Sequence, residues 1–197
     1  GKKMLSYEES LKILKETNSL LEGHFILSSG LHTNKYVQCA KLLSHPQKAQ
    51  VLCASLCEKI KKKFNKIDII LSPAIGGIVI GYEIGRQLGC ESIFSERLNH
   101  KLVLRRGFKI PENSNVLIVE DVITTGKSAL ECAEIVKISK SKLLGFSCLI
   151  DRSDANCLIK NEIVSQVKVQ ITTYKEEELP EDLKKLNPTK PGSRNLP

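Results

Sequence analysis

Two adjacent acids and a hydroxyl-rich loop stand together in the stretch VLIVEDVITTGKS at residues 116–128. Its Gly-Lys-Ser ending is typical of a nucleotide triphosphate loop, but that motif needs a glycine five positions before Gly126, where this chain has Asp121. Because a carboxylate there would repel phosphate, an ATPase or GTPase is disfavoured. Glu120 and Asp121 can instead accept hydrogen bonds from sugar hydroxyls or hold a metal ion through water. Capping, or ion pairing with a nearby lysine, is the purely structural alternative.

The loop that follows these acids offers the groups that bind a single phosphate. Thr124, Thr125 and Ser128 carry hydroxyls, and the first turn of a helix leaves backbone amides that can donate to phosphate oxygens. Gly126 permits a close backbone approach or a positive φ. Ser128 can equally cap the helix, since Glu131 follows at the spacing of a capping box. The two roles are compatible, so the motif describes a hydroxyl-bearing sugar beside a terminal phosphate.

Three apolar strands are expected to position these loops. A pattern of apolar strand, polar loop and helix occurs in IDIILSPAIGGIVIGYEIGRQLG and again in NVLIVEDVITTGKSALECAEIVK, and KLLGFSCLIDRSDA adds a third strand. Strands that alternate with helices predict a parallel sheet, whose ligands bind beyond the carboxyl ends of the strands. Those ends lie at residues 72–77, 120–128 and 151–152, so we expect the three loops to share one site.

The remaining segments are predicted from periodicity and turn signals. Apolar residues at about helical spacing predict a helix over residues 7–21, ending before Gly23. HFILSSG and KYVQCA predict a small β-containing flap around a turn at residues 30–34. A second helix is predicted over residues 47–63, and its lysine-rich end suits the helix dipole better than a nucleic-acid site, because aromatic residues do not interleave with the lysines. The tail from Tyr174 is expected to wrap the surface.

Composition limits the class of protein and its partners. The 197 residues, 41% hydrophobic and 26% charged, fit one globular domain, and a formal charge of +8 suits anionic partners, either nucleic acid or phosphorylated small molecules. Only 5% of residues are aromatic, which disfavours stacking on single-stranded nucleic acid. The seven scattered cysteines are expected to be buried small hydrophobes in a reducing cytosol, and Cys53 and Cys57 make a poor metal site without histidines. Neither a signal peptide nor a membrane span is predicted.

The stretch at residues 116–128 resembles the phosphoribosyl diphosphate (PRPP) signature of type I phosphoribosyltransferases. From about Gly23 onward, GHFILSSGLHTNKYVQCAKLL, SPAIGG, ERLNHKLVLRRGF, LIDRSDA and the ending PGSRNLP are similar to bacterial orotate phosphoribosyltransferases. The resemblance implies a single α/β domain with a parallel sheet flanked by helices, divided into a small hood at residues 1–45, a core at 46–173 and a tail at 174–197. It also implies a cytoplasmic homodimer in pyrimidine biosynthesis that makes orotidine 5′-phosphate and diphosphate from orotate and PRPP.

The same resemblance assigns the ligand contacts. Glu120 and Asp121 would contact the ribose hydroxyls, and the 5-phosphate loop would comprise Val122, Ile123, Thr124, Thr125, Gly126, Lys127 and Ser128. The pyrophosphate loop would comprise Ala74, Ile75, Gly76 and Gly77, often with a cis peptide, although the two glycines can also serve a tight helix entry. Mg²⁺ would be held through substrate oxygens, with Asp121 reaching it through water and with no direct side-chain ligand.

For the base, the resemblance implies contacts from Thr124 and Arg152. A guanidinium suits a carboxylated pyrimidine, although Arg152 can instead pair with Asp151 or Asp154. Ser28 stands where the best-studied branch of the family has a hood lysine, so that contact must be absent or replaced.

A basic loop that moves over the site is the last feature implied by the resemblance. The segment ERLNHKLVLRRGF corresponds to that loop, and only Arg97 aligns with a basic residue of the family's pattern. His100, Lys101, Arg105 and Arg106 lie nearby in the sequence. We therefore take Arg97, His100 and Lys101 as catalytic candidates beside Glu120 and Asp121, while His100 alone could be an ordinary surface histidine. In the family this loop reaches into the neighbouring subunit. A uracil or purine phosphoribosyltransferase and a nucleic-acid-binding regulator are the rival readings, and neither a nucleic acid nor a membrane is an expected partner.

Overall fold

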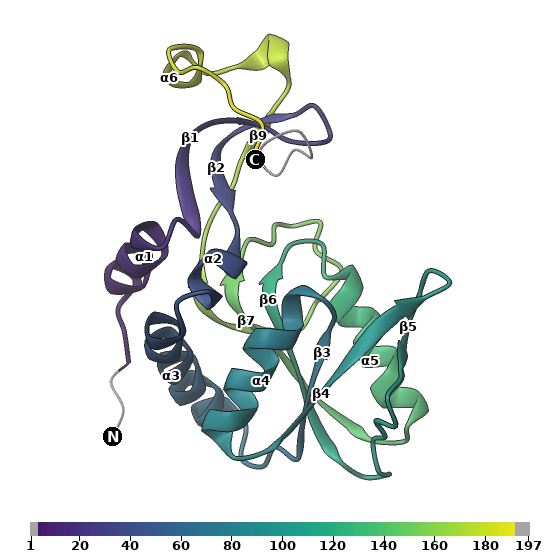
Figure 1. Ribbon diagram of the computed structural model, residues 1–197. Helices are drawn as coiled ribbons and strands as arrows, with labels where there is room; N and C mark the ends of the chain where they lie inside the picture. Colours follow the sequence, from purple (N-terminus) through teal and green to yellow (C-terminus); the bar gives the residue numbers. More distant parts are fainter. Residues whose placement is uncertain (1–3, 192–197) are drawn as a thin grey trace.

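A computed structural model describes residues 4–191 and shows a helix-flanked sheet beneath a smaller hood (Figure 1). The main sheet has six strands in the order β5-β4-β3-β6-β7-β8. Its parallel strands are β3 (Ile69–Pro73), β4 (Glu91–Leu98), β6 (Asn115–Ile123), β7 (Lys142–Asp151) and β8 (Ile163–Lys168). The short edge strand β5 (Lys101–Leu104) runs antiparallel to β4. The predicted α/β fold with a parallel sheet is confirmed.

Helices cover both faces of this sheet because its central strands are apolar on both sides. Ile70 packs in one buried cluster with α3 (Pro46–Lys63) and α4 (Gly76–Leu88), on the side where α1 (Tyr7–Glu16) also lies. Ile69 and Leu71, whose side chains point to the opposite face, pack in a second cluster with α5 (Lys127–Ile138). The two clusters form the interior that holds the strand ends in place.

Both ends of the chain build the hood. β1 (Leu20–Ile26) and β2 (His32–Val37) form an antiparallel hairpin, and the short α2 (Cys39–Leu43) leads back to the core. The third hood strand, β9 (Thr173–Tyr174), comes from the C-terminal part and pairs with β2. The tail continues through a 3₁₀ turn (Glu176–Glu178) and α6 (Glu181–Lys184), and then returns to the hood. The tail therefore follows the surface as predicted and also completes the hood sheet, which the sequence did not indicate.

Two local predictions need correction or extension. The helix predicted over residues 7–21 ends at Glu16, because Asn18 adopts a left-handed φ of 60° and Leu20 begins β1. The ERLNHKLVLRRGF segment contains an unforeseen hairpin, in which Asn99 and His100 both have positive φ, as a two-residue turn requires. The helix predicted over residues 47–63 is confirmed as α3, with Pro46 in its first turn.

Several further expectations can be compared with the described residues. The seven cysteines are free, and all except the half-buried Cys90 are buried, as predicted. Within residues 4–191 no helix is long and apolar enough to span a bilayer. Of the family-like ending PGSRNLP, residues 192–197 lie outside the described part of the chain.

Candidate active site

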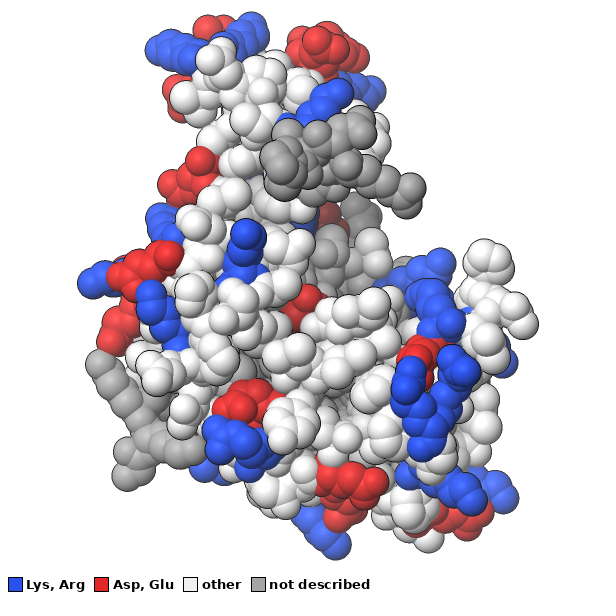
Figure 2. Space-filling view, viewed as in Figure 1, with Lys and Arg blue, Asp and Glu red and all other residues white. Residues whose placement is uncertain are grey.

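The three loops expected to share a site do lie at one edge of the sheet. β3, β6 and β7 are adjacent in the sheet order and run parallel, so their carboxyl ends meet beneath the hood. The loops at residues 72–77, 120–128 and 151–152 follow these ends directly. In the space-filling view, an acidic patch lies below the hood near the middle of the face, and Lys and Arg side chains gather over the β4–β5 side (Figure 2).

The acids at the end of β6 are half-buried and reach the neighbouring loop. A Cβ atom at position 76 would lie 2.8 Å from Oδ2 of Asp121, so the Asp121 carboxylate rests against the backbone of Gly76 and would have to shift to admit a side chain there. The Val122 N–H donates to Oδ1 of Asp121 over 2.8 Å. The acid pair and the glycine loop after β3 therefore belong to one site.

Burial changes the acidity of this pair. Loss of solvent, followed by the charge of Asp121, raises the pKa of Glu120 from 4.5 to about 8. Burial also raises the pKa of Asp121, and the Val122 N–H partly offsets this effect. Two adjacent carboxyls that are costly to ionise, at a strand end beside a phosphate-type loop, are typical of a functional site.

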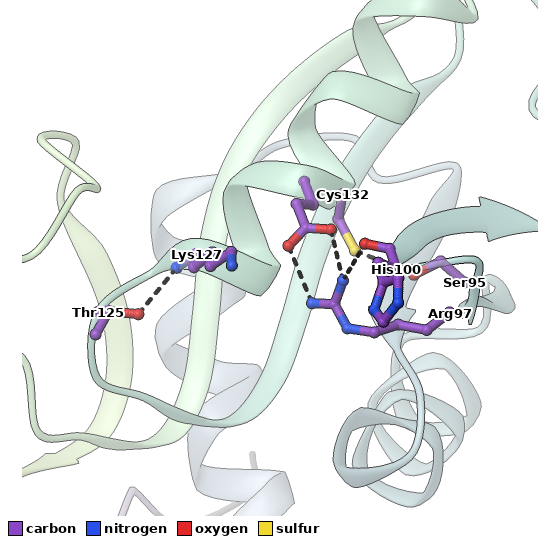
Figure 3. A network of polar contacts seen from close by, with 7 residues as sticks. Ser95, Arg97, His100, Thr125, Lys127 and Cys132 are labelled. Carbon is purple, nitrogen blue, oxygen red and sulfur yellow. Dashed lines mark hydrogen bonds and ion pairs between the residues drawn. The ribbon is translucent and has the colours of Figure 1, made fainter.

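The loop after β6 presents an open helix N-terminus. Gly126 is the N-cap of α5 with φ 81°, and the helix begins at Lys127. The capping box predicted for Ser128 and Glu131 is wrong, because Ser128 already lies inside the helix and the cap position is a glycine without a side-chain cap. Thr125 Oγ1 accepts a hydrogen bond from the Lys127 N–H over 3.3 Å (Figure 3). The first-turn amides beyond it have no intrahelical partner and can donate to a phosphate.

The glycine loop after β3 combines the two roles considered for it, a tight helix entry and a loop whose amides can donate to a ligand. Its Ala74–Ile75 peptide is cis, as the family resemblance implied. The Ala74 N–H donates to the carbonyl of Ser95 over 2.7 Å, so this amide is not available to a ligand, contrary to expectation. α4 begins at Gly76, and the Ile78 N–H donates to the carbonyl of Ile75, which leaves the amides of Gly76 and Gly77 as the first-turn donors of this loop.

Arg152 follows β7 and has an unused donor. Its backbone N–H donates to the carbonyl of Ile123 over 3.0 Å, which ties it to the end of β6. Its Nε is buried and has no hydrogen-bond partner among the described residues, and burial is the main cause that lowers its pKa. Oδ1 of Asp151 accepts from the Ser153 N–H, and Oδ1 of Asp154 accepts from the Asn156 N–H. The geometry therefore favours a role of the Arg152 guanidinium in ligand binding over an ion pair with Asp151 or Asp154, which was the alternative.

Two residues that sequence reasoning missed lie near Arg152. Tyr36 of β2 is close enough to raise the pKa of Arg152, which opposes the larger effect of burial. Lys168 lines the same cavity as Arg152, with a volume of about 650 Å³. The aromatic residue in KYVQCA was a signal that could have indicated Tyr36, whereas nothing local distinguished Lys168. Thr124 is exposed at the end of β6, and Ser28 is exposed in the hood turn.

The basic hairpin β4–β5 is held against α5. Arg97 donates through Nη1 and Nη2 to both carboxylate oxygens of Glu131, at 3.0 Å each, and Nη1 also donates to the carbonyl of His100 (Figure 3). Arg106 makes a similar two-pronged contact with Glu96. His100 and Lys101 are exposed near the turn. Nη1 and Nη2 of Arg97 thus donate within the chain, one turn along α5 from the loop after β6.

Sequence comparisons relate this chain to one family of enzymes. The model of the phosphoribosyl transferase domain matches residues 40–183. The orotate phosphoribosyltransferase of Methylorubrum extorquens is 45% identical over 96% of this chain and 97% of its own. That of Caldicellulosiruptor saccharolyticus is 42% identical over 98% of this chain and 100% of its own. The chain belongs to the orotate phosphoribosyltransferase family.

Solved structures of phosphoribosyltransferases share the fold of this family member. The orotate phosphoribosyltransferase of Aeropyrum pernix superimposes with a TM-score of 0.67 at 21% identity, covering 80% of this chain and 92% of its own. That of Mycobacterium tuberculosis, in complex with inorganic phosphate, gives 0.62 at 18% identity, covering 81% of this chain and 95% of its own. At these identities the likeness shows the fold alone.

The acidic pair of this phosphoribosyltransferase is suited to a metal shared with a substrate. Among residues 4–191 no group of three or more His, Cys, Asp and Glu side chains is arranged to hold a metal ion. Mg²⁺ keeps several waters and commonly binds through one or two carboxylates together with substrate phosphates. Glu120 and Asp121 fit such a partial donor set.

Proposed function

We propose that this protein transfers the 5-phosphoribosyl group of PRPP to N1 of orotate, giving orotidine 5′-phosphate and diphosphate on the route to UMP. The observation that carries the proposal is Arg152, whose buried Nε has no partner in the described part of the chain and which is tied to the end of β6, beside the proposed sugar-phosphate loop. Planar guanidinium groups form charge-assisted hydrogen bonds with carboxylates, which orotate has and neutral purines and uracil lack. The names and high coverage of the relatives support the same base.

The residues around the sugar act by positioning and electrostatics. Glu120 and Asp121 accept hydrogen bonds from the ribose hydroxyls and stabilise positive charge that develops on the sugar. The amides at the start of α5, with the hydroxyls of Thr124, Thr125 and Ser128, hold the 5-phosphate. The amides at the start of α4 receive the departing diphosphate. Holding the reacting atoms in line supplies much of the rate acceleration, and no covalent nucleophile is required.

Mg²⁺ is proposed as the cofactor. When bound, it would supply positive charge that neutralises the departing diphosphate. Asp121 would orient one of its waters, because its carboxylate rests against the glycine loop that receives the diphosphate. Glu120 would remain on the ribose hydroxyls.

The proposed binding site of the orotate base lies between the hood and the end of β7. Arg152 donates to the orotate carboxylate or a ring carbonyl, and Thr124 faces the same strand end. Tyr36 supplies an aromatic ring from the hood, on which a pyrimidine can stack. Lys168 lines the cavity of Arg152 and adds a second positive charge. This charge would replace that of the family's hood lysine, since this chain has the neutral Ser28 at that position.

The hairpin supplies positive charge for the diphosphate. Arg97, His100 and Lys101 are the catalytic candidates on it, and a basic segment over the leaving group also excludes water. Arg97 would exchange Glu131 for the diphosphate, because one guanidinium cannot serve both anions with the same donors. His100 and Lys101 stand at the exposed turn and are free to approach a ligand or a neighbouring subunit.

A homodimer is proposed from the exposed apolar side chains of α4. Ile75, Val79 and Tyr82 lie one helical turn apart and are 86%, 53% and 68% exposed, and Val51 of α3 is exposed as well. A contiguous exposed apolar surface commonly marks a protein interface. Free buried cysteines support a reducing compartment, and we propose that the dimer works in the cytoplasm.

The test is to mix purified protein with PRPP and Mg²⁺ and to follow consumption of orotate, uracil, hypoxanthine and adenine in separate reactions. Orotate alone should be consumed, and omission of Mg²⁺ should stop the reaction. The variant Asp121→Asn keeps the size of the side chain and should remain folded but lose most turnover. Consumption of a purine or uracil without orotate would overturn the assignment of the base.

A further inference from the structure

The loop after β7 lies directly against the phosphate loop. We call residues 153–159 the floor segment. A Cβ atom at position 126 would lie 2.7 Å from Cγ1 and 3.0 Å from Cδ1 of Ile159, and 3.3 Å from Sγ of Cys157. Both side chains are buried, at 6% and 5% exposure. The backbone of Gly126 therefore rests on an apolar floor without a gap.

Backbone hydrogen bonds attach the floor segment to the phosphate loop and to itself. The Leu158 N–H donates to the carbonyl of Thr125 over 2.8 Å, directly beside the Gly126 contact. The Cys157 N–H donates to the carbonyl of Asp154, and Lys160 Nζ donates to the carbonyl of Cys157. The segment is thus a braced turn rather than a loose connection.

The phosphate loop needs such an external support. Its N-cap, Gly126, has no side chain that could fix the first turn of α5, and glycine in the left-handed region is conformationally permissive. Apart from the Lys127 N–H, which donates to Thr125 Oγ1, the orientation of the amides toward a phosphate then depends on what packs below. Ile159 provides the closest contact and Leu158 provides the hydrogen bond.

We infer that the floor segment is a positioning element for the 5-phosphate of PRPP, with Ile159 as its principal side chain. The Ile159 side chain sets how far the Gly126 backbone lies from the floor segment. The hydrogen bond from the Leu158 N–H sets the orientation of the Thr125 carbonyl and its peptide plane. The floor segment begins directly after Arg152. It therefore also fixes the position of the phosphate loop relative to Arg152, the proposed orotate contact. The inference rests on the proposed function, since it takes PRPP as the ligand of the loop.

The test compares two truncations in the same apolar cluster. Ile159→Ala removes the floor contact, and Ile110→Ala removes a comparably buried side chain of that cluster outside the site. Ile159→Val retains the γ carbon nearest to Gly126 and serves as the conservative variant. The Kd for PRPP is measured by titration calorimetry, kcat and KM are measured for each substrate, and thermal melting reports stability.

Both alanine variants should lower the melting temperature to a similar degree. Only Ile159→Ala should weaken PRPP binding and kcat/KM for PRPP, by about 10- to 100-fold, since a displacement near 1 Å has effects of this order. The KM for orotate at saturating PRPP should remain nearly unchanged, and Ile159→Val should restore PRPP binding. Equal kinetic effects of Ile159→Ala and Ile110→Ala, or no effect of either, would overturn the inference. The proposed function would still stand in that case, provided that the wild-type protein converts PRPP and orotate. A wild-type protein that neither binds nor uses PRPP would overturn both.

Discussion

Replacement of Glu120 by glutamine should stabilise the protein while it removes activity. Burial raises the pKa of Glu120 from 4.5 to about 8 in the folded chain. Below pH 4.5 both the folded and the unfolded chain hold this proton, whereas between pH 4.5 and 8 only the folded chain retains it. The free energy of unfolding contributed by this group therefore falls as pH rises through that window and levels off above it.

The magnitude follows from the width of the window. Each pKa unit corresponds to about 1.4 kcal/mol, so ionisation of Glu120 costs the fold up to about 4 kcal/mol at pH 8. Glutamine has a similar size and does not ionise, so Glu120→Gln escapes this cost. For a chain of 197 residues a gain of this size corresponds to a rise in melting temperature of roughly 10 °C.

The assay is thermal or urea unfolding of wild type and Glu120→Gln at several pH values between 5 and 8, without ligands. The stability gap should be small at the acidic end and grow toward pH 8. The variant should turn over PRPP and orotate poorly even at pH 8, because glutamine never ionises and so cannot stabilise a cationic sugar as the ionised Glu120 carboxylate can. Glu112→Gln changes an exposed carboxylate and should give a gap that does not grow with pH. A constant gap for Glu120→Gln would refute the reasoning from burial.

Three further variants address the base, the hairpin and the interface. Arg152→Ala should raise the KM for orotate by about 10- to 100-fold, the value of a hydrogen bond to a charged group, with little change in the KM for PRPP; equal changes would exclude Arg152 as a base reader. Glu131→Gln should release Arg97 and tighten PRPP binding by up to about fivefold, the range of an exposed ion pair, whereas weaker binding in calorimetry would contradict competition between the two anions. Val79→Asp should halve the sedimenting mass by placing a charge in the apolar face of α4, and an unchanged mass would move the interface elsewhere.

The parts of the fold that depend on local pattern were predictable from the sequence. The apolar run before Glu120 and the glycine at position 126 specify a buried strand, a turn and a helix within a short stretch of chain. Because the strands alternate with helices, a parallel sheet follows, and with it the meeting of three loops at one edge. No long-range information was needed to predict this part of the site.

The hood required pairings that local signals do not specify. Thr173 joins the sheet opposite Thr33, which lies 140 positions earlier in the chain, and two strand residues give no periodicity to detect. The first helix was predicted too long because Leu20 and Leu21 continued its apolar spacing. Their partners Val37 and Tyr36 draw them into a hairpin instead, and tertiary pairing of this kind overrides local propensity.

The errors at the site itself had a different cause. Ser128 and Glu131 have the spacing of a capping box, but the cap position belongs to Gly126, whose backbone lies too close to Ile159 for any side chain. Glu131 is then available to bind Arg97. The general rule for helix starts failed here because the left-handed backbone at Gly126 begins the helix before Ser128.

Three local deficits of this chain become intelligible when they are considered together. The carboxyl of Glu120 is buried at an energetic cost, the N-cap of α5 is a glycine that makes no side-chain cap, and Nε of Arg152 has no partner within residues 4–191. Each would be a defect in a purely structural protein, because buried polar groups are normally satisfied. Ribose hydroxyls, a 5-phosphate and a pyrimidine carboxylate would satisfy them in turn, and the proposed product, orotidine 5′-phosphate, carries all three. The three features thus support the proposed product on grounds separate from the names of the relatives.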